Sequence, residues 1–294
     1  MPHDHAHDHT PPKDLGPAFQ WAVGLNTAYV VVEGAAGWIT GSLALLADAA
    51  HNLTDVAGLL IAWGAAVLAK KVVTARHTWG LGRATILAAL LNAVAILIGV
   101  VAVIWEAAHR LSDPVAVPGL VVMWVALIGI AVNTGSALLF MSARKGDLNA
   151  RGAFLHMAAD AAVSGAVVLA AIGIMATGWD WLDPIVAILV SGLIAVTAYG
   201  LLRDALHLSL DGVPEGVTRD QIADFLTEQD GVTGLHDLHI WPLSTTRTAV
   251  SVHLIWGGAD ADAFIERVTD ALVDHYGIAH VTMQLESVPC ERAA

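Results

Sequence analysis

Six stretches of about 20 mainly apolar residues alternate with short polar links along most of the chain. At 1.5 Å per residue, a helix of this length crosses a hydrocarbon core of ~30 Å. The stretches are residues 18–38, 43–69, 81–107, 117–141, 150–176 and 182–206. The pattern therefore predicts an all-α transmembrane domain of six helices over residues 17–208.

Cationic residues are distributed unevenly among the links. The links after the second and fourth stretches hold Lys70, Lys71, Arg76, Arg83, Arg144, Lys145 and Arg151, and the other three links hold only Arg110. By the positive-inside rule, the two basic links face the cytosol. Because the number of crossings is even, both termini are expected in the cytosol as well.

Beyond Arg203 the chain changes to mixed polar and apolar residues, which predicts a soluble domain over residues 209–290. Two segments, TRDQIADFLTEQ and DADAFIERVTDALVDHY, have helical spacing, and three, LHDLHIWPL, TAVSVHLIW and HVTMQLESV, alternate as strands do. The order αββαβ predicts a small α+β domain with its helices on one face of a sheet. It does not predict the strand order.

Composition agrees with a membrane protein and narrows the partners. Apolar residues make up 56% of the chain, and the mean hydropathy of +0.65 lies above the soluble average. A net charge of -13 with only 14 Lys and Arg argues against a nucleic-acid partner. The single cysteine, Cys290, excludes zinc sites built from several thiolates, whereas 14 histidines make imidazole the abundant nitrogen ligand.

The first 16 residues form a polar tail without the features of a secretory signal. His3, His5, His7 and His9 alternate there with acidic or small residues, a composition typical of a disordered segment that binds metal weakly. Whether the tail is required or fortuitous stays open.

Two of the apolar stretches each contain a histidine followed four residues later by an aspartate. The pairs are His51 with Asp55 and His156 with Asp160. Residues four apart share a helix face, so two such helices can surround one ion with two imidazoles and two carboxylates. This set suits tetrahedral zinc at ~2.0–2.2 Å, and cobalt, nickel or iron also use it.

An ordinary polar interaction within each pair is the alternative. Inside a bilayer, however, an ionisable residue near a helix centre costs at least ~2.5–3.5 kcal/mol, which favours a metal or proton function. The two pairs reach the same depth only if the fifth helix begins around Asp147, before its apolar run. We expect that it does.

Six more polar residues lie inside the predicted helices. Asp48, one turn before His51, has three open interpretations: a proton carrier, an acceptor for a ligating histidine, or a cavity-lining residue. For Asn26, Glu33, Asn92, Glu106 and Asn133, hydrogen bonding between helices is the default.

Together these motifs resemble the cation diffusion facilitator family, and in particular its bacterial zinc exporters. The resemblance rests on GSLALLADAAHNLTD, HTWGLGRATILAALLNA, RGAFLHMAADA and HDLHIWPLS, and it extends from about Gly16 to Glu286. It implies a six-helix membrane domain, a cytosolic ferredoxin-like domain, a homodimer in the inner membrane and metal/proton antiport. By position it implies that His51, Asp55, His156 and Asp160 are the transport ligands. Histidine at the first of these positions is similar to the zinc-preferring members and puts manganese or iron transport in doubt.

The resemblance also indicates cytosolic positions. His77 lies where some relatives hold a second metal site, but its matching neighbours here are Thr74 and Leu81, so loop packing is the alternative. The positions near the cytosolic metal sites of the family are His236, His239, His253, His280 and Glu286. Strand alternation turns His253 and His280 outward, where they are free to bind metal or are simply solvated.

The resulting hypothesis is an exporter, not an enzyme. Cytosolic metal displaces protons from His51 and His156 and leaves on the other side when the site is protonated again. Zinc is the favoured ion, both as cargo and as a candidate regulator, and no catalytic cofactor is expected. The alternatives are transport of cobalt, cadmium or nickel, proton-coupled transport of another substrate, and a membrane metal sensor. An intramembrane metalloenzyme would need a general base, and the sequence contains no HExxH motif.

Overall fold

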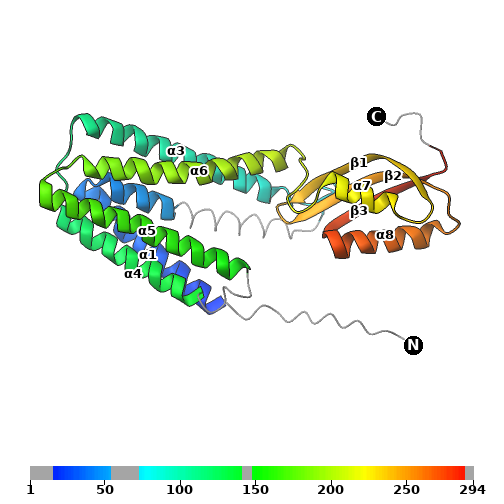
Figure 1. Cartoon of the computed structure of the whole chain (residues 1–294), viewed down its shortest axis with the longest axis horizontal. Helices are drawn as coiled ribbons and strands as arrows, with labels where there is room; N and C mark the ends of the chain where they lie inside the picture. The colour runs from blue at the N-terminus through cyan, green and yellow to red at the C-terminus, as the bar shows by residue number, and fades with distance from the viewer. Residues whose placement is uncertain (1–15, 54–72, 141–147, 289–294) are drawn as a thin grey trace. The chain divides into compact units, whose positions relative to one another are not determined.

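A computed structural model describes residues 16–53, 73–140 and 148–288 of the chain (Figure 1). Its contacts divide the chain into two compact units. The first comprises residues 1–57 and 96–196, and the second comprises residues 58–95 and 197–294. Among the predicted site residues, Asp55 lies outside the described residues.

Long apolar helices occupy the predicted membrane-spanning stretches. They are α1 Gly16–Thr40, α3 Ala84–Ser112, α4 Gly119–Phe140, α5 Leu148–Thr177 and α6 Leu182–Ser209. The second stretch is helical over residues 43–53, where its described part ends. Four helices among the described residues are long and apolar enough to cross a membrane: 84–112, 119–138, 157–177 and 182–209. The prediction of a helical transmembrane domain is therefore confirmed.

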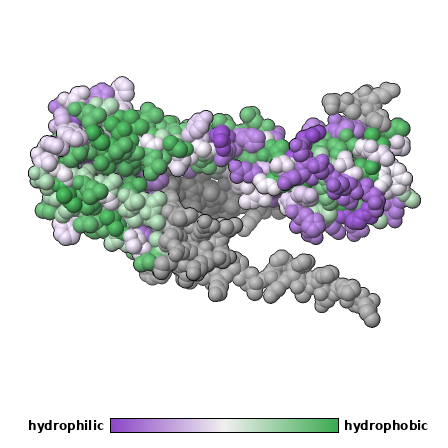
Figure 2. Space-filling model, viewed as in Figure 1, coloured by the Kyte–Doolittle hydropathy of each residue, from purple (hydrophilic) through white to green (hydrophobic). Residues whose placement is uncertain are grey.

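The helix of the fifth stretch begins early enough for the two HxxxD pairs to lie at the same depth in the membrane. The structure starts α5 at Leu148, next to the expected Asp147, although its most apolar part begins later. Large apolar side chains on these helices are strongly exposed: Trp38 is 81% exposed, Trp105 is 69% exposed and Val196 is 72% exposed. Figure 2 shows hydrophobic surface over these helices, as is typical of helices that face lipid.

Residues 43–53 pack against two different groups of helices. Ala44 and Leu45 belong to a buried cluster with residues of α1, α4 and α5. Leu43 and Ala47 belong to a second cluster with residues of α3 and α6. The described part of this helix has small or apolar residues on both of these sides and lies between the two groups of helices (Figure 1).

The C-terminal region has the predicted element order αββαβ. Its elements are α7 Arg219–Thr227, β1 Val232–Ser244, β2 Arg247–Trp256, α8 Ala261–Tyr276 and β3 Ile278–Glu286. The three strands lie in the order β1-β2-β3, with β1 antiparallel and β3 parallel to β2. Figure 2 shows many hydrophilic side chains on this part of the chain, in contrast to the membrane-type helices.

Local signals place the two helices of this domain. Thr218 and Gln221 form a capping box at the start of α7, and the Asp260 side chain accepts a hydrogen bond from the Ala263 amide at the start of α8. Gly277 ends α8 with φ 66°, a left-handed conformation that favours glycine. The chain can therefore turn directly from α8 into β3.

One hydrophobic core joins both helices to a single face of the sheet. Val250, Val252 and Leu254 of β2 are fully buried, and the same cluster contains residues of α7 and α8 such as Leu226 and Leu272. This arrangement confirms the alternation predicted for β2. His253 therefore lies on the opposite face of the sheet, as expected.

Replacement of Leu272 by alanine tests this core. Leu272 is fully buried, whereas its neighbour Val273 is 44% exposed on the same helix. We expect Leu272→Ala to lower the opening free energy of α8 and β3 by about 2–5 kcal/mol because it leaves a cavity. Val273→Ala should change it by less than about 0.5 kcal/mol. Amide hydrogen exchange of the full chain measures both, and equal losses would show that Leu272 is not a core residue.

Candidate metal sites

His51 and Asp160 meet between two helices of the first unit. His51 lies on the helix of residues 43–53, and Asp160 lies on α5. Nε2 of His51 is 3.6 Å from Oδ1 of Asp160, and Asp160 is 2% exposed. An imidazole and a carboxylate from the two predicted pairs are thus adjacent, although the residues are more than 100 positions apart in the sequence.

The two remaining members of the predicted set are less fully described. His156 lies on α5 one turn before Asp160, so the backbone places it on the same side of the helix. Asp55 lies outside the described residues, four residues after His51 in the sequence. The structure therefore brings together one residue from each pair.

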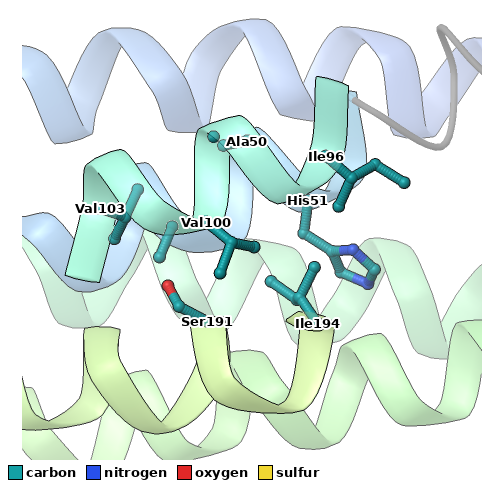
Figure 3. A pocket seen from close by; sticks show the side chains of 9 residues that line it. Ala50, His51, Ile96, Val100, Val103, Ser191 and Ile194 are labelled. Carbon is teal, nitrogen blue, oxygen red and sulfur yellow. The ribbon is translucent and has the colours of Figure 1, made fainter. Parts of the chain in front are cut away.

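A small cavity borders His51. Its volume is about 30 Å³, enough for a water molecule, and it is lined by residues of the helix 43–53, α3 and α6. Figure 3 shows the His51 imidazole near Ile96 of α3 and Ile194 of α6, with Ser191 as the one hydroxyl among the labelled side chains. His51 thus contacts Asp160 and also lines a cavity whose other side chains, apart from Ser191, are apolar.

Asp48 takes part in a separate buried network. Its carboxylate accepts hydrogen bonds from Ser164 Oγ at 3.1 Å and from Asn52 Nδ2 at 3.5 Å. Asn52 Nδ2 also lies 3.4 Å from Glu33 Oε2, and the Tyr29 hydroxyl donates to Glu33 Oε1 at 2.6 Å. Both carboxylates are fully buried. The network connects α1, the helix 43–53 and α5 just beside the His51–Asp160 contact.

This network gives the polar residues of α1 a structural role. Asn26 donates to Ser136 Oγ of α4 at 3.1 Å, and Glu33 accepts from Asn52 on the neighbouring helix. Hydrogen bonding between helices, predicted for five polar residues, is confirmed for Asn26 and Glu33. Glu106 instead pairs with Arg110 on its own helix, and the buried Asn133 side chain has no hydrogen-bond partner among the described residues. The sequence did not predict a role for Tyr29, Asn52 or Ser164. The only signal in the sequence is that each of these residues lies four positions from a carboxylate, which places the two on the same face of a helix.

A second cluster lies on the outer face of the C-terminal sheet. His236, His253 and Glu286 hold ligand atoms within 4.8 Å of one another, the only such group of three found in the described part of the chain. His236 Nε2 is 3.0 Å from Glu286 Oε2, and His253 Nδ1 is 2.9 Å from Glu286 Oε1. The carboxylate therefore lies between the two imidazoles.

Strand pairing and a bulge build this cluster. His236 of β1 is directly opposite His253 of β2, and Glu286 pairs with Ile255 on the other side of β2. A register shift between His236 and His239 and a positive φ of 50° at Asp237 interrupt the alternation of β1. As a result, Asp237 Oδ2 lies 3.5 Å from His236 Nδ1 and 3.9 Å from His253 Nδ1.

The chemistry of the cluster fits a divalent metal. The hydrogen bond with Glu286 raises the pKa of His236. Nδ1 of both imidazoles is buried without a well-aligned hydrogen bond among the described residues. Two nitrogens and one carboxylate, with a second carboxylate nearby, form a donor set that zinc accepts.

The other predicted cytosolic residues lie elsewhere. His239 is exposed and lines an open hollow with Arg83, Asp211 and Trp241. His280 is exposed, and its ring packs edge-on against Trp79 at a centroid distance of 4.8 Å. The side chain of His77 is exposed, and its backbone pairs with Thr74 in a tight turn. The structure does not bring these three histidines into the cluster of His236, His253 and Glu286.

Comparison with known proteins agrees with both parts of this structure. Residues 20–208 match the cation efflux transmembrane domain, and residues 214–288 match the cytoplasmic domain of cation efflux proteins.

Curated relatives match over almost the whole chain. The zinc transporter ZitB of Yersinia pestis is 37% identical, with 92% of this chain and 87% of the relative covered. The cadmium, cobalt and zinc/H(+)-K(+) antiporter of Bacillus subtilis is 35% identical, with 89% and 86% covered. The metal cation efflux system protein CzcD of Cupriavidus metallidurans is 33% identical, with 98% and 92% covered. With a membrane domain, a cytoplasmic domain and relatives that match along both, the chain belongs to the cation diffusion facilitator family of cation efflux proteins.

Proposed function

We propose that this protein exports divalent transition metal, with zinc as the main substrate, from the cytosol in exchange for protons. The observation that carries the proposal is the contact between the partly buried His51 and the buried Asp160, which joins the two HxxxD helices. It is supported by relatives named as zinc transporters and as a cadmium, cobalt and zinc/H(+)-K(+) antiporter. Cobalt, cadmium and nickel are alternative cargoes because they accept the same ligands.

The transport site consists of His51, Asp55, His156 and Asp160. Helical geometry supports this set of ligands, because each Asp follows its His by about one helical turn. In addition, His51 of the first pair lies next to Asp160 of the second pair. Two imidazoles and two carboxylates neutralise a divalent cation where the bilayer provides no water. The four side chains together satisfy the tetrahedral preference of zinc.

Exchange of metal for protons follows from the ligand chemistry. A histidine binds metal only when its imidazole is neutral, so protonation of His51 or His156 opposes binding. Metal that enters from the cytosol releases protons from the site, and reprotonation from the outside releases the metal. The inward proton gradient then supplies the free energy for export.

We further propose the complete architecture. It comprises a His-rich tail at residues 1–16, six transmembrane helices over 17–208 and a ferredoxin-like domain over 209–290 in the cytosol. The excess of Lys and Arg in two links supports cytosolic termini in the inner membrane. Residues 214–288 match the cytoplasmic domain of this family, which is named as a dimerisation domain. This match supports a homodimer.

The cluster of His236, His253 and Glu286 is proposed as a cytosolic metal site with a regulatory role. Its buried imidazole nitrogens and the nearby Asp237 carboxylate support metal binding. A metal ion there would hold β1, β2 and β3 together, so occupancy favours one arrangement of the sheet over others. This differential affinity is what regulation by metal requires.

Removal of a transport ligand tests the main proposal. We expect Asp160→Asn to lower gradient-driven zinc uptake into everted vesicles by at least about tenfold, because loss of even an outer group around a metal costs 10–100-fold. Asp113→Asn, at an exposed aspartate just after α3, is the matched control and should transport normally. Equal uptake by Asp160→Asn and the native protein would contradict the assignment of Asp160.

Metal counting tests the cytosolic site. Glu286→Gln and His253→Ala should each reduce the zinc bound to the detergent-solubilised full chain by about one ion per chain, because each removes one of three clustered donors. His280→Ala is the control, since His280 lies outside the cluster. Equilibrium dialysis with metal analysis gives the stoichiometry. The site would be wrongly assigned if His280→Ala lost the ion and Glu286→Gln retained it.

A further inference from the structure

The helix that carries His51 begins at a tightly bonded turn. Gly41 adopts φ 71°, a left-handed conformation, and Ser42 precedes the first helical residue, Leu43. The first amides of a helix have no partners within the helix, and a membrane interior provides no water for them. Every one of these donors therefore needs an acceptor from elsewhere.

Ser42 satisfies part of this requirement from within its own segment. Its side-chain oxygen accepts a hydrogen bond from the Leu45 amide at 3.2 Å, and its carbonyl accepts from the Leu46 amide at 3.2 Å. Ser42 is thus an ordinary N-cap for the helix 43–53.

The other two amides are bonded by a residue of a different helix. Asp183, in the first turn of α6, accepts from the Leu43 amide at 2.6 Å and from the Ala44 amide at 3.4 Å. The same carboxylate accepts from Ser42 Oγ at 2.5 Å. One side chain therefore bonds three consecutive residues at the start of the His51 helix.

This bond is buried and lies at the N-terminus of a helix. Asp183 is 2% exposed and Ser42 is fully buried, so the interaction is not weakened by solvent. The partial positive charge at a helix N-terminus favours a carboxylate at this position. Arg110 of α3 donates to the Gly41 carbonyl and to Glu106, which adds a cation at the same turn.

The position of this bond along the helices connects it to the metal site. His51 follows Leu43 by eight residues, about 12 Å along a helix. On α6, Ser191 follows Asp183 by the same eight residues, and it lines the cavity beside His51 (Figure 3). A bond between Leu43 and Asp183 therefore determines which part of α6 lies beside His51.

We propose that Asp183 is a positioning residue for transport: by bonding the start of the helix 43–53 to α6, it sets the height of the transport ligand His51 beside α6. The inference rests on the proposed function, because it assigns Asp183 to the alignment of the transport ligands. A helix N-cap alone does not need Asp183, since Ser42 provides one locally. The carboxylate from α6 adds a connection between two helices that a local cap cannot make.

The test separates this connection from simple capping. Asp183→Asn retains the size of the side chain and one acceptor oxygen, but it turns an amide group toward the backbone amides of the helix. The double variant Asp183→Ala with Ser42→Asp places a carboxylate at the local N-cap and leaves no side-chain hydrogen-bonding group at position 183 of α6 to bond it. Val190→Ala, in the same buried cluster as Leu43, is the control for loss of packing.

Zinc uptake in everted vesicles is measured as KM and maximal rate, with thermal unfolding of each purified full chain. We expect Asp183→Asn to raise KM about tenfold, the lower end for loss of a group that orients a metal ligand. The double variant should regain thermal stability but keep the raised KM. Val190→Ala should lose stability with a native KM.

Two results would overturn the proposal: a native KM in Asp183→Asn, or full recovery of KM in the double variant, which would make Asp183 a cap only. The native protein and Asp160→Asn are measured in the same vesicles. Absence of zinc uptake by the native protein would contradict the proposed function itself, whereas native uptake with an unchanged KM in Asp183→Asn would contradict only the role of Asp183.

Discussion

The hydrocarbon core of a bilayer supplies no water to satisfy a polar group, so each polar group on the helix 43–53 must find its partner within the protein. Asp48 and Asn52 find theirs in Ser164 of α5 and Glu33 of α1. His51 lies next to Asp160, and the first amides of the helix are bonded by Asp183 of α6. This one short helix is consequently connected by polar contacts to three of its neighbours, while its small apolar residues fill the space between them.

The same constraint separates the buried polar side chains into two groups. The network of Tyr29, Glu33, Asp48 and Asn52 is already satisfied within the protein, so it stabilises the arrangement of helices. A His and an Asp from the two HxxxD pairs remain together beside a small cavity. A buried ion pair is costly unless it is compensated, and a divalent cation is an effective means of compensating two carboxylates at once.

Much of this organisation was predictable from periodicity. The apolar stretches gave the helices, and the requirement that two HxxxD pairs share one depth gave the early start of α5 at Leu148. Alternation in TAVSVHLIW gave the buried side of β2 and the outward direction of His253. The grouping of His236 and His253 with Glu286, but not with His239 or His280, was not predictable. It depends on strand register and on the bulge at Asp237, which sequence alternation does not reveal. The role of Asp183 was equally hidden, because an aspartate at the end of an apolar stretch is usual where a helix meets water, and only the fold brings it to Leu43.

The central claim is that two histidines and two aspartates on two helices bind the transported ion. X-ray absorption spectroscopy of zinc bound to the full chain, with His253 and the four tail histidines replaced by alanine, tests it most directly. The account predicts one tightly bound zinc with two nitrogen and two oxygen neighbours at about 2.0–2.2 Å. Zinc surrounded by six oxygens, or the same spectrum after Asp160→Asn, would contradict it.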